Sequence, residues 1–151
     1  MAAAKTTPEI HRAIRSLQRL TDLFAERRRQ LARAAVLSEA QWRLLEEIAG
    51  EAFMPSMFAR RQDCAPAAVS RTLRQLLERE LVVVSISPQD ARQRVYKLTP
   101  TGRRTLRNLN RSRERAIAEI WEHFSARELA EFTRFASVLG DELEEYRRRE
   151  K

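Results

Sequence analysis

The sequence predicts a mainly α fold with a single small β-hairpin, and three observations support this. Apolar residues recur at intervals of three and four along most of the chain, the spacing typical of amphipathic helices. Glycine is scarce, at 3 of 151 residues, and only one short stretch, residues 81–99, is rich in β-branched residues. The hydrophobic content of 43% is enough for a core, so we expect one compact domain.

The charge of the chain points to a polyanionic partner. The formal net charge is +8, with 10 basic and 4 acidic residues between positions 55 and 104. The first 54 residues hold 9 basic and 7 acidic residues, and residues 105–151 hold 10 of each. The positive charge favours either nucleic acid or an acidic membrane surface as the partner, and its excess lies in the middle of the chain.

Several classes of protein are excluded by the composition. No stretch approaches the ~20 apolar residues of a membrane span, and the first residues lack the apolar run of a signal peptide. A single cysteine, Cys64, excludes an intramolecular disulfide. We therefore expect a cytoplasmic protein that does not act at a membrane.

The positive middle region contains a helix suited to reading bases, predicted over residues 66–79. Pro66 fits the first turn of this helix, because its missing N–H would be unpaired there. A buried stripe is predicted at Val69, Leu73, Leu76 and Leu77. The opposite face carries the candidate DNA-binding residues Ser70, Arg71, Arg74 and Gln75. Arginine pairs with guanine edges and glutamine with adenine edges, although an ordinary solvated helix face has the same composition.

A β-hairpin is predicted directly after this helix. Its strands are residues 81–87 and 94–99, and Pro88, Gln89 and Asp90 supply the turn. Arg92 and Arg94 then lie at the tip, where they are candidates for contact with DNA phosphates or the minor groove. Asp90 is expected to orient Arg92 through a charge-assisted hydrogen bond. A short helix from residue 55, a turn, the helix and the hairpin together make a winged helix-turn-helix.

The flanking helices predict a symmetric dimer. Helices are expected over residues 8–34, 38–49, 100–124 and 125–149, with capping boxes at Ser38 and Ser125. The terminal helices carry more apolar residues than one core needs, so we expect them to pack against a second copy. The predicted division is 1–34 and 101–151 for dimerisation and 35–100 for DNA binding. Two recognition helices ~34 Å apart would meet a pseudo-palindromic operator.

No catalytic or metal site is predicted. The two histidines, His11 and His123, lie on different helices, and no set of acid, base and nucleophile converges, so we expect neither an enzyme nor a cofactor. Cys64 is interpreted as a core thiol, with a redox sensor as the alternative.

A ligand site is the remaining candidate. His11 and Arg15 share a helix face and could hold a carboxylate beside a cleft. The cluster of Phe53, Met54, Met57 and Phe58 is expected mainly in the core, but Phe53 and Met54, with Trp42, could also wall that cleft.

Two segments resemble MarR-type winged-helix regulators. The segment DARQRVYKLTPTG is similar to the wing of that family, and AAVSRTLRQLLERELV is similar to its recognition helix. The resemblance implies a homodimeric DNA-binding regulator, a repressor released from DNA by a small phenolic or aromatic acid, or by oxidation. Three positions depart from the family pattern: Glu80 where glycine is usual, Ala91 in place of a wing arginine, and Gln62 in an apolar position.

Two other functions fit the same residues. One is an architectural or RNA-binding winged helix without an effector, which would show little preference between duplex sequences. The other is an interaction module that presents its basic face to an acidic protein.

Overall fold

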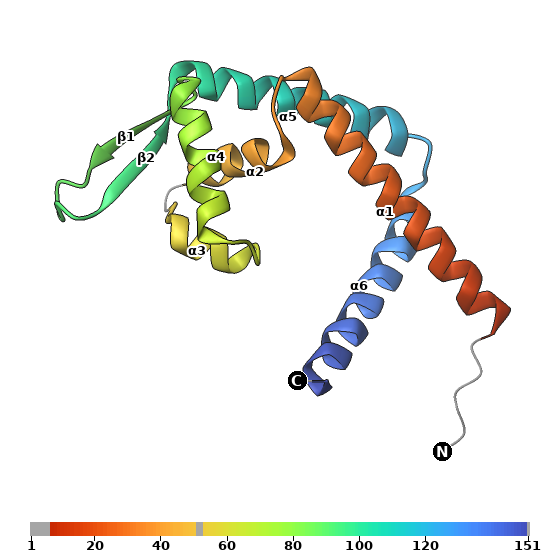
Figure 1. Cartoon of the computed structure of the whole chain (residues 1–151). Helices are drawn as coiled ribbons and strands as arrows, with labels where there is room; N and C mark the ends of the chain where they lie inside the picture. Colours follow the sequence, from red (N-terminus) through yellow and green to blue (C-terminus); the bar gives the residue numbers. More distant parts are fainter. Residues whose placement is uncertain (1–6, 51–52, 151) are drawn as a thin grey trace. The chain divides into compact units, whose positions relative to one another are not determined.

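A computed structural model describes residues 7–50 and 53–150 of the chain (Figure 1). The described residues are mostly helical and contain one two-stranded antiparallel sheet, as the sequence predicted. In chain order the elements are α1 (Pro8–Ala34), α2 (Glu39–Ala49), α3 (Pro55–Arg61), α4 (Pro66–Glu78), β1 (Val82–Ile86), β2 (Arg94–Leu98), α5 (Pro100–Trp121) and α6 (Ala126–Arg149).

The chain forms two compact units, residues 1–112 and 113–151. The first unit contains α1 to α4, the hairpin and the first half of α5, and the second contains the end of α5 and α6. The predicted boundaries of the dimerisation segments, after residues 34 and 100, remain predictions.

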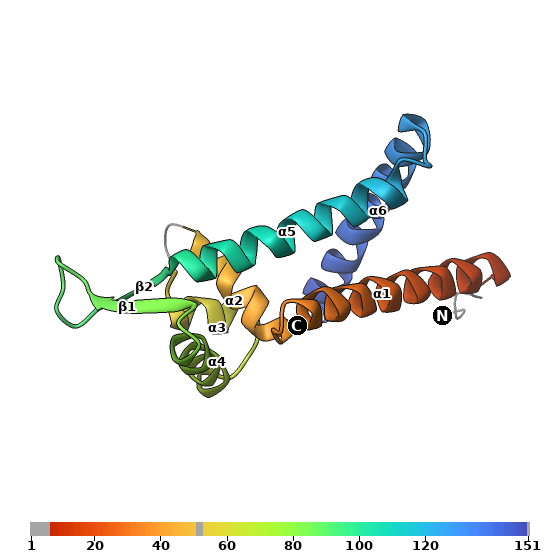
Figure 2. The ribbon, with the colours of Figure 1, turned by 90° about the horizontal axis from the view of Figure 1, so that it is seen from above.

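The core of the first unit lies where α2, α3 and α4 meet. Trp42, Leu45 and Leu76 are at most 1% exposed, as their apolar spacing predicted. The base of the hairpin closes this core through Val82 and Leu98. In Figures 1 and 2 the rest of the hairpin extends away from these three helices. The remaining core residues are Leu31, Ala32, Leu37, Leu44, Ile48, Phe58, Ala59, Val69, Leu73, Leu81, Leu106 and Leu109.

The apolar cluster at the start of α3 is only partly in the core. Phe58 is buried and Phe53 is half-buried against the core, as expected. Met54 and Met57 are 42% and 51% exposed, so the expectation that the cluster lies mainly in the core was wrong for these two residues. The physical reason is that α3 has only seven residues, which is about two turns and leaves one narrow face to bury.

Both predicted capping boxes are present. The Ser38 hydroxyl accepts a hydrogen bond from the Gln41 N–H, and the Gln41 side chain accepts one from the Ser38 N–H. Ser125 and Glu128 make the same exchange at the start of α6. Hydrogen bonds from the Ser125 hydroxyl and backbone N–H lower the pKa of the Glu128 carboxyl, because they stabilise its charged form.

Three helices are followed by a residue in the left-handed backbone conformation, which favours glycine, although none of the three residues is glycine. Val36, Asp63 and Glu80 have positive φ angles of 56°, 48° and 54°. Each follows a helix end whose carbonyls are closed by a pair of backbone hydrogen bonds, such as Glu80 N–H to Leu77 O and Leu81 N–H to Leu76 O. The left-handed region costs an ordinary residue about 1–2 kcal/mol, and Val36 is also β-branched. The departure at Glu80 therefore leaves the turn geometry intact but strained.

The hairpin pairs Val82 with Leu98 and Ile86 with Arg94 in an antiparallel register. Its tip is closed by the Ser87 N–H, which donates to Gln93 O at 2.8 Å, and by the buried Ser87 hydroxyl, which accepts from the Gln89 N–H. These bonds hold the tip of the wing in one shape.

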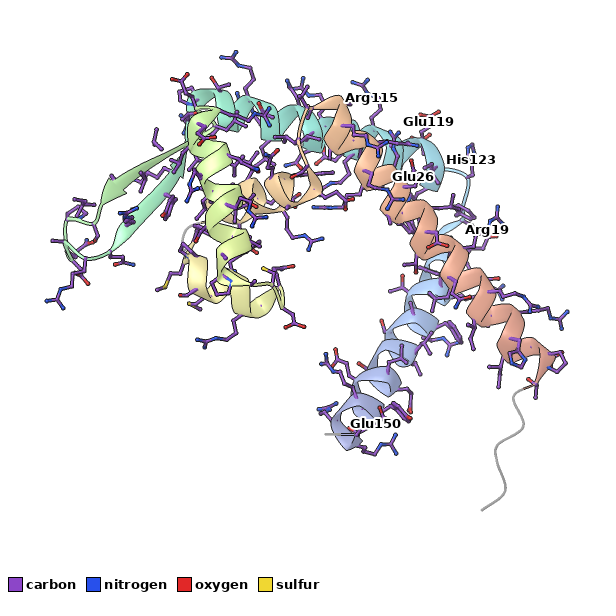
Figure 3. All side chains as sticks on the ribbon, viewed as in Figure 1. Arg19, Glu26, Arg115, Glu119, His123 and Glu150 are labelled. Atoms are coloured by element: carbon purple, nitrogen blue, oxygen red, sulfur yellow. The ribbon has the colours of Figure 1, made fainter. Side chains whose placement is uncertain are left out.

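The second unit presents its apolar residues to solvent. None of the α6 residues is buried, and in Figure 3 side chains extend from this helix on all sides. Trp121 contacts the rings of Phe124 and Phe132, with centroids 6.2 and 6.3 Å apart. One face of α6 carries large exposed apolar side chains: Phe132, Phe135, Val138, Leu143 and Tyr146.

Helix α1 also exposes its apolar residues to solvent over most of its length. Its C-terminal end reaches the core, and the Cζ atom of Arg28 lies 4.2 Å from the centroid of the Trp42 ring. Nearer its N-terminus the apolar residues are between 41% and 59% exposed: Ile10, Ile14, Leu17, Leu20, Leu23 and Phe24. An apolar stripe of this size left in water favours association.

Candidate nucleic-acid interface

The outer face of α4 presents the side chains that the sequence predicted for base reading. Val69, Leu73 and Leu76 are buried on the inner side of the helix. On the other side Ser70, Arg71, Arg74 and Gln75 are all exposed. No acidic side chain of the described residues forms an ion pair with Arg71 or Arg74, so both guanidinium groups are available to a ligand.

Gln75 differs from its neighbours on this face because it is held by another helix. Its Oε1 accepts a hydrogen bond from Nε2 of Gln41 at 3.1 Å. Gln41 lies in α2, is 9% exposed and also accepts from Arg79 at 3.2 Å. Sequence reasoning missed this contact, because the two glutamines are 34 positions apart and nothing local connects them.

The wing tip carries Arg92 and Arg94, as predicted, and both are exposed. Asp90 orients this tip by a different route from the one expected. Its Oδ1 accepts from the backbone N–H of Arg92 at 2.9 Å, and no hydrogen bond to the Arg92 guanidinium is present among the described residues. The carboxylate therefore fixes the backbone turn and leaves the guanidinium to external ligands.

A groove lies between β2 and the start of α3, and it joins residues predicted for two different roles. Its volume is about 330 Å³. Phe53 and Met54, predicted for a ligand, line it together with Arg92 and Arg94, predicted for DNA. The rings of Phe53 and Tyr96 meet edge to face, with centroids 5.8 Å apart at 82°. Sequence reasoning missed Tyr96, although positions 94 and 96 of β2 follow the period of two that places strand residues on one face.

The other predicted ligand residues lie elsewhere. His11 and Arg15 are exposed in the N-terminal half of α1, whereas Trp42 is buried under Arg28. Neither this groove nor the smaller cavity beside Cys64 is lined by any of the three. Of the five residues predicted to bind a ligand, Phe53 and Met54 therefore lie together in the groove of the single chain, and the other three do not line it.

Cys64 lies half-buried in an apolar setting. It lines a cavity of about 140 Å³ with Leu44, Phe58 and Val69 and packs against the core. This packing supports the interpretation of Cys64 as a small apolar residue of the core.

The described residues contain no cluster of three or more His, Cys, Asp or Glu side chains able to hold a metal ion. Within residues 7–50 and 53–150, no helix combines the length and the apolar character needed to cross a membrane.

Comparison with known proteins relates this arrangement to one family. Residues 37–93 match the model of the MarR family. A crystal structure of a MarR family transcription regulator superposes with a TM-score of 0.81 at 17% identity, covering 91% of each chain. Staphylococcus aureus MarR in complex with salicylate and kanamycin gives 0.76 at 19% identity, over 96% of this chain and 99% of that one.

A DNA complex is also among the similar structures. A variant of S. aureus MepR bound to an oligodeoxyribonucleotide gives a TM-score of 0.63 at 14% identity, over 87% of this chain and 97% of that one. The search of curated proteins found no match. At these identities the solved structures establish a shared fold.

Proposed function

Residues 37–93 of this chain form a MarR-family winged helix-turn-helix region, and from this premise we propose that the protein is a dimeric, sequence-specific DNA-binding transcriptional regulator. Members of the family are transcription regulators and not enzymes. The observation that carries the proposal is the exposed pair Arg71 and Arg74 on the outer face of α4, beside a wing with two further arginines. Helix and wing then have separate roles, since base contacts give specificity and phosphate contacts give position.

The arginines of α4 provide the first test. Replacing Arg71 or Arg74 by alanine should weaken binding to the preferred duplex by about 1–3 kcal/mol and relax base preference, because each guanidinium loses a bidentate base contact. The preferred duplex is obtained by selection from a randomised library, and affinities are measured by fluorescence anisotropy at several salt concentrations.

Arg134→Ala is the matched control, because Arg134 is an exposed arginine of the second unit, on α6. It should leave base preference unchanged. An architectural or RNA-binding role would be supported instead if the wild type bound scrambled and selected duplexes equally. A module for an acidic protein would bind neither.

The second part of the proposal concerns release from DNA. The groove between β2 and α3 offers aromatic rings and two arginines, which together suit a small aromatic carboxylate. Its volume of about 330 Å³ is at the lower end of the range for ligand pockets, so a single-ring acid is the appropriate size. An arginine that binds this carboxylate cannot bind a DNA phosphate, so the acid would relieve repression by competition. A contribution from His11 and Arg15 remains a prediction.

Benzoate is the probe for this groove. Its affinity, measured by isothermal titration calorimetry, should fall about tenfold or more in Arg94→Gln, because the charge-assisted bond is lost. Lys97→Gln is the matched control: it removes one charge from the same strand at a side chain outside the groove. Equal affinity of wild type and Arg94→Gln, or equal affinity of the neutral analogue benzamide, would place the ligand elsewhere.

A further inference from the structure

The hydrogen bonds around Gln41 fix which atom of Gln75 is left facing outward. The Gln41 Oε1 receives the Ser38 N–H at 3.0 Å and the Arg79 guanidinium at 3.2 Å. Both partners can only donate, so the Gln41 atom between them must be the oxygen. The other end of the same amide is then an NH₂ group, which can only donate.

The orientation of the Gln41 amide in turn fixes the orientation of the Gln75 amide. The Gln41 Nε2 donates to Gln75 across 3.1 Å, so the Gln75 atom that it meets must be the oxygen. The second atom of the Gln75 amide, Nε2, remains for the outside. Gln75 is exposed and lies four residues after Arg71, on the same side of α4.

We propose that Gln41 is a positioning residue that makes Gln75 an NH₂ donor toward DNA, so that Gln75 selects a base edge of acceptors. In the major groove guanine (N7 and O6) and thymine (O4) present acceptors alone, whereas adenine presents its N7 acceptor beside the N6 amino donor and cytosine presents only its N4 amino donor. The usual bidentate pairing of glutamine with adenine needs the amide oxygen beside the NH₂ group at the base edge, and here that oxygen is directed to Gln41 of α2. The inference rests on the proposed function, because it assumes that α4 enters a major groove.

A single substitution should reverse this selection. In Gln41→Glu both side-chain oxygens accept, so Gln75 must turn its NH₂ group inward and its oxygen outward. The outward oxygen then selects donors, which are N6 of adenine and N4 of cytosine. Glutamate retains the capping box with Ser38, since it is equally suited to that position, and the Arg79 guanidinium compensates its charge. Thermal unfolding of the variant checks that the fold is kept.

The experiment is selection from a randomised duplex library, followed by sequencing, for the full-length wild type and four variants. Gln75→Ala identifies the base position concerned, because preference is lost there and kept elsewhere. At that position the wild type should prefer guanine or thymine. Gln41→Glu and Gln75→Glu should both prefer adenine or cytosine, by about tenfold.

Gln62→Glu is the control for added negative charge, because it is an exposed glutamine of the same unit that accepts from Arg43. It should lower affinity for all duplexes without changing preference. The inference is overturned if Gln75→Ala changes no position, or if Gln41→Glu keeps the wild-type preference. If either result is obtained while the wild type still shows a base preference that depends on Arg71, the proposed function is retained. A wild type without any preference overturns both.

Discussion

Replacing Gly102 by alanine is expected to lower the free energy of unfolding by about 1–3 kcal/mol, the cost of overpacking against a group that cannot move aside. A Cβ atom at this position would overlap the backbone carbonyl oxygen of Leu81 and lie 3.0 Å from its carbonyl carbon. That oxygen also accepts the Thr99 N–H at 3.1 Å, so it is held in place.

The surroundings of Gly102 explain why relief is difficult. The Gly102 N–H donates to the Thr99 hydroxyl at 2.9 Å, and that hydroxyl donates to Glu80 O at 2.6 Å. Arg103 in turn donates to Leu98 O at 2.7 Å. The start of α5, the end of the recognition helix and the base of the wing are thus joined within a few residues. A methyl group inserted there must displace all three.

Gly140 supplies the matched control. A Cβ atom there meets nothing within 4 Å, and the residue lies inside α6. Gly140→Ala should therefore stabilise by up to about 1 kcal/mol through helix propensity. Urea denaturation followed by circular dichroism measures both variants. Equal stability of Gly102→Ala and the wild type would contradict the close approach of α5 to Leu81.

The second large effect is expected at the apolar face of α6. Phe135 is 59% exposed in the single chain, so in Phe135→Glu a charge would replace an apolar contact in each copy of a dimer. Burial of a phenylalanine contributes about 1.5–3 kcal/mol, and a two-fold interface loses two of them. The dissociation constant of the dimer should therefore rise at least a hundredfold. Analytical ultracentrifugation across a dilution series measures it.

Ser137→Glu separates this effect from added charge alone. Ser137 is exposed and lies two residues from Phe135, about 200° around the helix, on its opposite side. The dimer should persist in this variant. Loss of the dimer should also lower affinity for a two-half-site duplex much more than for a single half-site, because linked binding is lost. A wild type that sediments as a monomer at micromolar concentration would contradict the symmetric arrangement.

Local chemistry made much of this fold predictable. The helix starts at Ser38 and Ser125 can be predicted because a capping box is contained within four consecutive residues. Likewise, the buried stripe of α4 follows from spacing alone, and its outward face follows from the stripe. The position of the basic residues at the tip of the wing follows from the turn residues Pro88, Gln89 and Asp90.

What could not be predicted depends on contacts between distant segments. Glutamine on the outer face of such a helix is typical of a residue that reads adenine. Only the packing of α2 against α4 shows that the Gln75 amide oxygen accepts a hydrogen bond from Gln41. Met57 has the hydropathy of a core residue, but the brevity of α3 leaves it in water. Val36 ends a helix in a conformation that its side chain disfavours, so no residue signal marked it.

The chain has two tryptophans, one in each compact unit, which gives it two built-in optical reporters. Trp42 is 1% exposed beneath a guanidinium and should emit at short wavelength, whereas the half-buried Trp121 beside two phenylalanine rings should emit farther to the red. Variants that keep one indole therefore report separately on the DNA-facing unit and on the unit proposed for pairing. Quenching of each tryptophan's fluorescence by a solute would show whether binding of DNA, or of a second copy, changes the exposure of the tryptophan in the other unit.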